Sequence, residues 1–192
     1  MQVKEVLLLL TNQWADWEAA YAIYGVNTVS QYTVKTIATD KEAKVSMGGL
    51  RASVDYTIDS YTNFDDLAML ILPGGFEWQQ GRHDEIAAFV KKIIDLGIPV
   101  AAICGATIFL GKHGFLDKVK HTGDDLELFQ KEQGYNGQDF YLSAQIAVDN
   151  GIITANETAA VEFAQAIFGM LKIYTDEEIE GWYNYFKYGI VR

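Results

Sequence analysis

Strand-like and helix-like segments alternate along the whole chain. Apolar or β-branched runs, typical of buried strands, occupy residues 3–11, 32–39, 67–72 and 98–103. Segments predicted as helices, most with apolar residues three or four positions apart, occupy residues 16–24, 84–96, 106–113, 124–132 and 158–171. This alternation predicts an α/β protein with a mostly parallel sheet covered by helices on both faces. In such a fold, functional sites lie outside the carboxyl ends of the strands.

Turn signals predict several shorter elements. A Met-Gly-Gly turn divides residues 45–58 into two extended pieces. Residues 119–122 are strand-like, and an Asn-Gly pair predicts a hairpin between 143–148 and 152–155, because this pair tolerates the positive φ of a tight turn. These elements fit the same sheet.

Length and charge narrow the class of protein. The chain has 192 residues, one cysteine and a formal net charge of -11. We expect one domain over residues 1–192, since this length can bury a core without a metal or a disulfide. A single cysteine favours the reducing cytoplasm, and the acidic balance disfavours nucleic acid as a partner. No targeting signal is evident, and no apolar stretch approaches the ~18 residues that a membrane span needs.

Cys104 occupies a predicted turn between a strand and a helix, with Ala102 and Gly105 among its small neighbours. A nucleophile on such an elbow needs small residues around it, because the chain reverses sharply there. The helix N-terminus is expected to lower the pKa of the thiol. The amide of Gly105 would face an oxyanion. The alternative is an ordinary buried cysteine with no chemical role.

A second oxyanion donor is expected from Gly75. It belongs to Pro73-Gly74-Gly75, which ends the neighbouring strand and can face Cys104 across a cleft. The alternative is a turn that only ends a strand.

Three histidines are candidates for a base beside the thiol. His121 is our candidate, because the strand-like stretch before it can return the chain to the edge beside Cys104. His113 lies at the far end of the helix after Cys104, over ~10 Å away, and His83 lies in a polar loop. A surface histidine before a loop is the alternative for His121.

Glu18 follows the first strand and is flanked by Trp14 and Trp17. A buried carboxyl group there can stay protonated, donate a hydrogen bond to a thiolate or move a proton. The alternative is an acid favoured only by the first turn of a helix. The same segment lacks the glycine spacing of a dinucleotide site, so we expect no cofactor and no metal.

Aromatic residues are dense in the last segment, where Thr175 and Glu178 have capping-box spacing. The helical spacing of Trp182 and Phe186 favours core packing. The surplus of aromatic residues also suggests a homodimer contact.

The order of these parts resembles the ThiJ/PfpI superfamily of class I glutamine amidotransferase-like proteins. The resemblance runs over nearly the whole chain and is carried by Asp16-Trp17-Glu18, Leu70-Ile71-Leu72-Pro73-Gly74-Gly75, Ala101-Ala102-Ile103-Cys104-Gly105-Ala106, Gly114-Phe115-Leu116, Lys120-His121-Thr122 and Asp149-Asn150-Gly151-Ile152-Ile153-Thr154-Ala155. It implies a flavodoxin-like three-layer sandwich, frequent homodimers, and a reactive cysteine whose acid partner maps onto Glu18.

Two departures from the family pattern qualify the resemblance. Peptidase-like members have a histidine directly after the cysteine, where this chain has Gly105, so peptidase activity is doubtful. Thr154-Ala155-Asn156-Glu157 replaces a frequent Ser-Arg-Gly-Pro, which changes one rim of the pocket.

The sequence therefore predicts a cysteine-dependent hydrolase, amidase or lyase that acts on a small carbonyl or amide compound. Cys104 would attack, Glu18 would hold or move a proton, and His121 would assist. One alternative is a redox sensor or stress-protective protein in which Cys104 is oxidised and no substrate turns over. Another is a binding module with an unreactive thiol, whose pKa would be near or above ~8.5.

Overall fold

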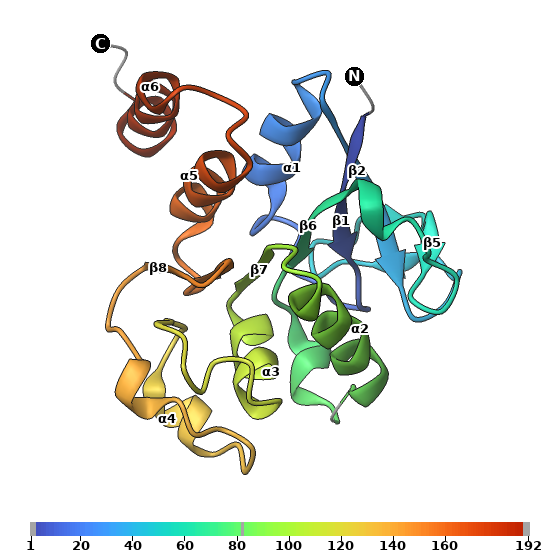
Figure 1. Cartoon of the computed structure of the whole chain (residues 1–192), viewed down its shortest axis with the longest axis vertical. Coiled ribbons are helices and arrows are strands. Elements are labelled where there is room, and N and C mark those ends of the chain that lie inside the picture. The colour runs from blue at the N-terminus through green and yellow to red at the C-terminus, as the bar shows by residue number, and fades with distance from the viewer. Residues whose placement is uncertain (1–2, 82, 190–192) are drawn as a thin grey trace.

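The fold is built on a seven-stranded sheet, seen in a computed structural model that describes residues 3–81 and 83–189 (Figure 1). The sheet strands are β1 Lys4–Leu9, β2 Tyr32–Ala38, β5 Tyr56–Thr57, β6 Leu67–Leu72, β7 Val100–Ile103, β8 Ile146–Asp149 and β9 Ile152–Ala155. Strands β3 Lys44–Val45 and β4 Arg51–Ala52 form a separate antiparallel pair. The helices are α1 Ala20–Asn27, α2 Asp84–Asp95, α3 Gly105–Lys112, α4 Leu126–Gln130, α5 Ala160–Leu171 and α6 Asp176–Tyr188, with short 3₁₀ turns at Phe64–Asp66, Phe76–Gln79 and Gln138–Phe140.

The strand order is β5-β2-β1-β6-β7-β9-β8. All neighbouring pairs are parallel except β8 with β9, which form the predicted hairpin at the sheet edge. The central strands β1, β6 and β7 therefore end at the same edge of the sheet. The segments that follow them carry Glu18, Gly75 and Cys104.

Two cores form the layers of the sandwich, one on each face of the sheet. Along β1, Val6 and Leu8 pack toward α1 and α5, whereas Leu7 and Leu9 pack toward α2, α3 and α4. Figure 1 shows the same division, with α1 and α5 on one side of the sheet and α2 and α3 on the other. This alternation is the reason that the central strands are apolar at nearly every position. The predicted flavodoxin-like sandwich is confirmed.

Several predicted boundaries are wrong for local reasons. The first helix begins at Ala20 rather than at residue 16, because Trp14 bridges to Gly75 and Asp16 accepts a hydrogen bond from the Ser46 hydroxyl at 2.7 Å. The predicted strand 119–122 does not join the main sheet. Only His121 forms a bridge there, with Tyr141.

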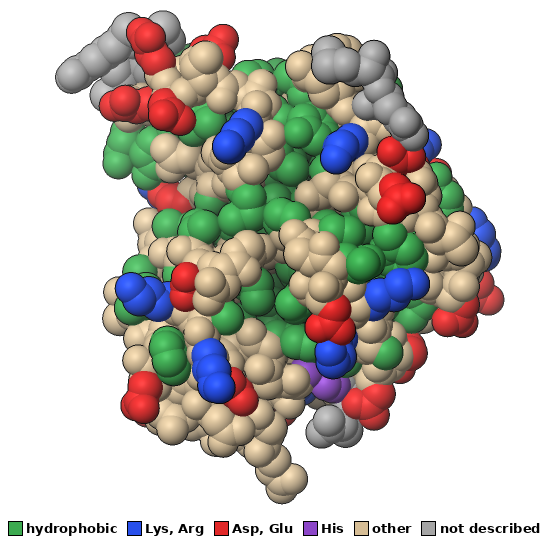
Figure 2. All heavy atoms as spheres, in the orientation of Figure 1, with side chains coloured by type: hydrophobic (Ala, Val, Ile, Leu, Met, Phe, Trp, Pro, Cys, Tyr) green, Lys and Arg blue, Asp and Glu red, His purple; other side chains and the backbone are tan. Residues whose placement is uncertain are grey.

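Helix α6 begins with the predicted capping box, in which Thr175 and Glu178 exchange hydrogen bonds. Trp182 packs on Phe168 of α5, with ring centroids 4.9 Å apart, whereas Tyr185 and Tyr188 are more than half exposed. Figure 2 shows acidic side chains gathered where Figure 1 places α6. Within residues 3–81 and 83–189, no helix has both the length and the apolar character needed to cross a membrane.

Candidate active site

Cys104 lies on a strained turn between β7 and α3. Its backbone angles are φ 55° and ψ -131°, and its amide donates to the Ala155 carbonyl at 2.9 Å. A positive φ is uncommon outside glycine and clusters at functional sites. The space beside the turn is tight, since a Cβ on Gly105 would lie 3.3 Å from the Gly75 carbonyl oxygen. Cys104 therefore lies on the sharp strand-to-helix turn that the sequence predicted.

The structure brings Glu18 and Cys104 together. Glu18 is only 1% exposed, and its Oε2 accepts a hydrogen bond from the Gly74 amide at 2.6 Å. The Cys104 thiol lies beside the same carboxyl group, close enough for each group to shift the pKa of the other. Gly74 lies between the pair, since a Cβ added there would meet Glu18 Oε2 at 2.6 Å and Cys104 Sγ at 3.0 Å.

Burial decides the protonation of this pair. It raises the pKa of Glu18 from 4.5 to about 7, against the opposing hydrogen bonds from Gly74 and Cys104. Burial also raises the pKa of the Cys104 thiol, and the charges of Glu18 and Asp124 raise it further. The Gly105 amide acts in the opposite direction but does not offset them. The lowered thiol pKa expected from the helix N-terminus is therefore wrong, because desolvation and neighbouring carboxylates outweigh the helix.

The two glycines that were expected to bind an oxyanion lie beside the thiol. The Gly105 amide is close enough to the Cys104 sulfur to act against the rise in the pKa of the thiol. The Gly75 amide makes no hydrogen bond within the described residues, whereas the adjacent Gly74 amide is held by Glu18. Gly75 and Gly105 both line the cavity beside Cys104.

His121 takes a different place from the one expected of it. It is fully buried, with Nδ1 at 2.7 Å from the Val119 carbonyl oxygen and Nε2 at 2.8 Å from the Tyr135 hydroxyl. It packs against Phe129 and does not line the Cys104 cavity. Burial lowers its pKa, which favours the neutral ring. As a correction, His121 belongs to the core under α4, because the stretch before it never returns to the sheet edge.

The other two histidines also lie outside the cavity. A ring nitrogen of His83 is 2.8 Å from the Glu77 carbonyl oxygen, and His113 packs on Phe109 with ring centroids 4.9 Å apart. The described cavity wall therefore holds no histidine. The described candidates for a proton acceptor near the thiol are carboxyl groups, and Glu18 is the buried one among them.

A cavity of about 650 Å³ opens in front of the thiol. Its lining residues are Ala15, Trp17, Glu18, Met47, Gly75, Phe76, Trp78, Gln79, Cys104, Gly105, Ile108, Asp124, Leu128, Lys131, Glu132 and Glu157. Aromatic and aliphatic side chains make up much of the wall, as is usual for sites that take small molecules. The wall contains four acidic side chains and one lysine, so it is predominantly acidic.

Asp124 and Glu157 are cavity residues that sequence reasoning missed. Asp124 was assigned to the start of a helix, and Glu157 stood out only as a departure from the family pattern. Their ligand oxygens and Cys104 Sγ all lie within 4.8 Å of one another, so the three groups could hold a metal ion. No metal was expected at this position, and the sequence does not indicate that these three groups lie close together.

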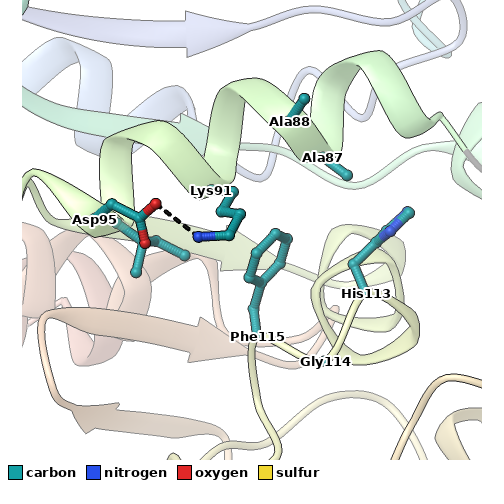
Figure 3. A pocket seen from close by; sticks show the side chains of 8 residues that line it. Ala87, Ala88, Lys91, Asp95, His113, Gly114 and Phe115 are labelled. Carbon is teal, nitrogen blue, oxygen red and sulfur yellow. Dashed lines mark hydrogen bonds and ion pairs between the residues drawn. The ribbon is translucent and has the colours of Figure 1, made fainter.

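A second hollow of about 420 Å³ lies between α2 and the end of α3 (Figure 3). Lys91 and Asp95 of α2 form an ion pair of 2.6 Å beside it. His113 and Phe115, in the segment that follows α3, line the opposite side. It is shallower and contains neither Cys104 nor Glu18. The chemistry of the chain is therefore concentrated in the larger cavity.

Fold and site together define an α/β protein with a cysteine on a strained strand-to-helix turn at the carboxyl edge of a mostly parallel sheet. The model of the DJ-1/PfpI family matches residues 4–170, and the chain belongs to this family.

Relatives with similar sequences and structures agree with this assignment. The "Uncharacterized protease YdeA" of Bacillus subtilis (strain 168) is 35% identical over 97% of this chain and 93% of its own length. "Uncharacterized protease YoaZ" of the same organism is 31% identical over 96% and 91%. The solved structure of the thiJ/pfpI family protein from Bacillus anthracis has a TM-score of 0.92 and 33% identity, covering 99% of this chain and 93% of that one. DJ-1 superfamily protein Atu0886 from Agrobacterium tumefaciens has a TM-score of 0.87 and 29% identity, covering 94% and 96%.

Proposed function

We propose that the protein is a cysteine-dependent hydrolase, amidase or lyase that acts on a small carbonyl or amide compound. The observation that carries this proposal is the close approach of the Cys104 thiol and the buried Glu18 carboxyl across Gly74, beside a cavity of about 650 Å³. A base with a pKa of about 7 suits proton transfer at neutral pH. The pair supplies a nucleophile and its proton acceptor without a histidine.

The proposed first step is addition of the Cys104 sulfur to the substrate carbonyl carbon. The new C–S bond forms as the thiol proton passes to the Glu18 carboxylate and the carbonyl π electrons move to the oxygen. The amides of Gly75 and Gly105 then stabilise that oxyanion. The thiol loses its proton only as the sulfur attacks. The mechanism therefore does not need a resting thiol with a lowered pKa.

For an amide, the oxyanion collapses and the C–N bond breaks, with the Glu18 proton passing to the leaving amine. Water then attacks the thioester, gives its proton to Glu18, and the Cys104 sulfur leaves and regains that proton. The sum is amide plus water giving acid plus amine. For an aldehyde, the adduct is a hemithioacetal, and Glu18 returns the proton to the oxygen.

The cavity favours a small compound over a polypeptide. The names of two relatives include the word protease. In this chain, however, Gly105 occupies the position after the nucleophile, and the described cavity wall contains no histidine. We therefore propose amide or carbonyl chemistry without a peptidase triad.

We also propose that the protein works as a cytoplasmic homodimer. Tyr185 and Tyr188 of α6 are 52% and 59% exposed, and exposed aromatic side chains are typical of interface cores. Light scattering of Tyr185→Glu/Tyr188→Glu against the wild type tests this contact. Equal masses for the two would contradict it.

The function is tested by a panel of small aldehydes, ketoaldehydes and primary amides, with products followed by NMR. We expect the wild type to consume at least one member. Cys104→Ser and Cys104→Ala should consume none, while circular dichroism and thermal melting show an unchanged fold. Turnover that survives both substitutions would contradict the mechanism.

A redox sensor is the second candidate, and it is favoured by the proximity of Glu18 to the only cysteine. A sulfinic acid on Cys104 would accept the hydrogen bond of a protonated Glu18. Intact-mass analysis after mild peroxide distinguishes the two functions. Selective gain of two oxygens on Cys104, together with a silent substrate panel, favours the sensor. A silent panel with no oxidation favours a binding module, which the raised thiol pKa also fits.

A further inference from the structure

The wall next to the nucleophile carries two carboxylates that the proposed reaction does not use. One oxygen of Asp124, one oxygen of Glu157 and the Cys104 Sγ all lie within 4.8 Å of one another. Like charges this close repel each other unless a cation lies between them. The arrangement persists because the backbone holds it.

Two loops fix these acids in place. The Glu157 amide donates to Asp124 Oδ1 at 2.7 Å, which ties the loop after β9 to the loop before α4. Asp124 Oδ2 and the Glu157 carboxylate make no hydrogen bond within the described residues, so they are available to a ligand. Glu132 adds a third acid to the wall, and Lys131 is the one cation among the described lining residues.

We propose that Asp124 and Glu157 select substrates that carry a protonated amine or guanidinium group close to the reacting carbonyl. This inference rests on the proposed function, because it assumes that a carbonyl carbon is held at Cys104 Sγ. A reacting carbon lies about 3–3.5 Å from the attacking atom. A cationic group one or two bonds farther along would then reach both carboxylates. Anionic substrates would be rejected at the same wall.

An organic cation suits this site better than a metal ion. Cys104, Asp124 and Glu157 match the number of protein ligands in a catalytic zinc site, but hard cations prefer oxygen ligands without sulfur. Here Glu157 is exposed, and the cavity of about 650 Å³ is much larger than one ion requires. Its aromatic wall, with Trp17 and Phe76, also suits a cation that carries carbon.

Binding of such a cation would also activate the nucleophile. The charge of Asp124 raises the pKa of the Cys104 thiol and, with Glu157, that of Glu18. A positive group between the two carboxylates offsets this effect. The thiol would then lose its proton more easily when the correct substrate is bound than when the cavity is empty.

The test uses three methanethiosulfonate reagents that modify thiols and differ in charge. They are the cationic trimethylammonium-ethyl, the anionic sulfonato-ethyl and the neutral methyl compound. Cys104 is the only cysteine, so loss of free thiol reports on this cavity alone. The rate constants for modification by the cationic and the anionic reagent are each divided by that for the neutral reagent. The ratio of these two values measures the local charge. The acidity of the thiol cancels from this ratio, because the same thiolate attacks each reagent.

We expect this ratio to fall about tenfold or more in Asp124→Asn/Glu157→Gln at low ionic strength. The variant should fold, because the asparagine at position 124 keeps the side-chain oxygen that accepts the hydrogen bond from the Glu157 amide and because the Glu157 side chain is exposed. Glu157→Gln alone should lower the ratio by a smaller factor. The matched control is Glu177→Gln/Glu180→Gln in α6, which removes the same charge far from the cavity and should leave the ratio unchanged. EDTA in all buffers prevents divalent cations from masking the acids.

An equal ratio in the wild type and the cavity variant would overturn the proposal, and so would an equal drop in the α6 control. Neither result depends on turnover. Failure of the proposed function would appear separately, as a substrate panel consumed equally well by Cys104→Ser.

Discussion

The Glu18 carboxyl and the Cys104 thiol lie close together across Gly74, and the missing side chain of that glycine leaves the space for this approach. The carboxyl group comes from the segment after β1, and the thiol comes from the end of β7. Parallel pairing of both strands with β6 places these ends at the same edge of the sheet, on either side of β6. The site is thus a direct product of the sheet topology.

Gly74→Ala is predicted to separate the pair. The new methyl group would lie 2.6 Å from Glu18 Oε2 and 2.7 Å from Cys104 Cβ, so one of them must move. We expect a loss of about 1–3 kcal/mol in the free energy of unfolding, the usual cost of overpacking. Turnover should fall by more than the folded fraction does. Denaturant melts and kcat/KM measured on the same preparation check this, and normal turnover per folded molecule would contradict it.

Glu18→Gln is predicted to stabilise the protein at pH 8 and to have little effect near pH 4. Burial raises the pKa of Glu18 from 4.5 to about 7. Between these values the folded state keeps a proton that the unfolded state has lost, so wild-type stability falls as the pH rises. The full shift corresponds to about 3 kcal/mol.

Thermal melts of the wild type and Glu18→Gln across this pH range measure the difference. Glu180→Gln, an exposed substitution in α6, is the control and should follow the wild type at every pH. A constant difference between Glu18→Gln and the wild type from pH 4 to pH 8 would refute the raised pKa.

Turnover is predicted to rise with pH through an apparent pKa of about 7, because Glu18 must be deprotonated to accept the thiol proton. Below that value, kcat/KM should fall about tenfold per pH unit. Glu18→Gln should lose 10²–10⁴-fold in kcat/KM, the usual contribution of a general base, and should lose this acid limb. A wild-type profile that is flat from pH 5 to pH 8 would show that another group accepts the proton.

The fold and the central pair could be predicted from the sequence because both depend on local patterns. Apolar runs identify the buried strands, and small residues around Cys104 indicate a turn whose direction is set by sterics. Glu18 follows a strand end, and the ends of parallel strands meet at one edge.

The positions of the remaining site residues depend on the paths of loops, and the pKa of the thiol depends on burial and on charges from distant parts of the chain. His121 follows a strand-like stretch, but that stretch pairs only with Tyr141 and directs the ring into the core. Asp124 and Glu157 meet because one backbone amide joins two loops 33 residues apart, which no periodicity reveals. The sign of the thiol pKa shift was also missed, because burial is a property of the whole packed cavity.

Intact-mass analysis of acid-quenched turnover tests the central claim most directly, since Cys104 is the only cysteine that can carry a thioester or hemithioacetal. During turnover of a panel substrate, the account predicts a wild-type species heavier by the transferred group, with the added mass on the peptide that contains Cys104. Cys104→Ser should show neither the adduct nor turnover. Substrate consumption by Cys104→Ser at the wild-type rate, with no adduct in either protein, would contradict the account.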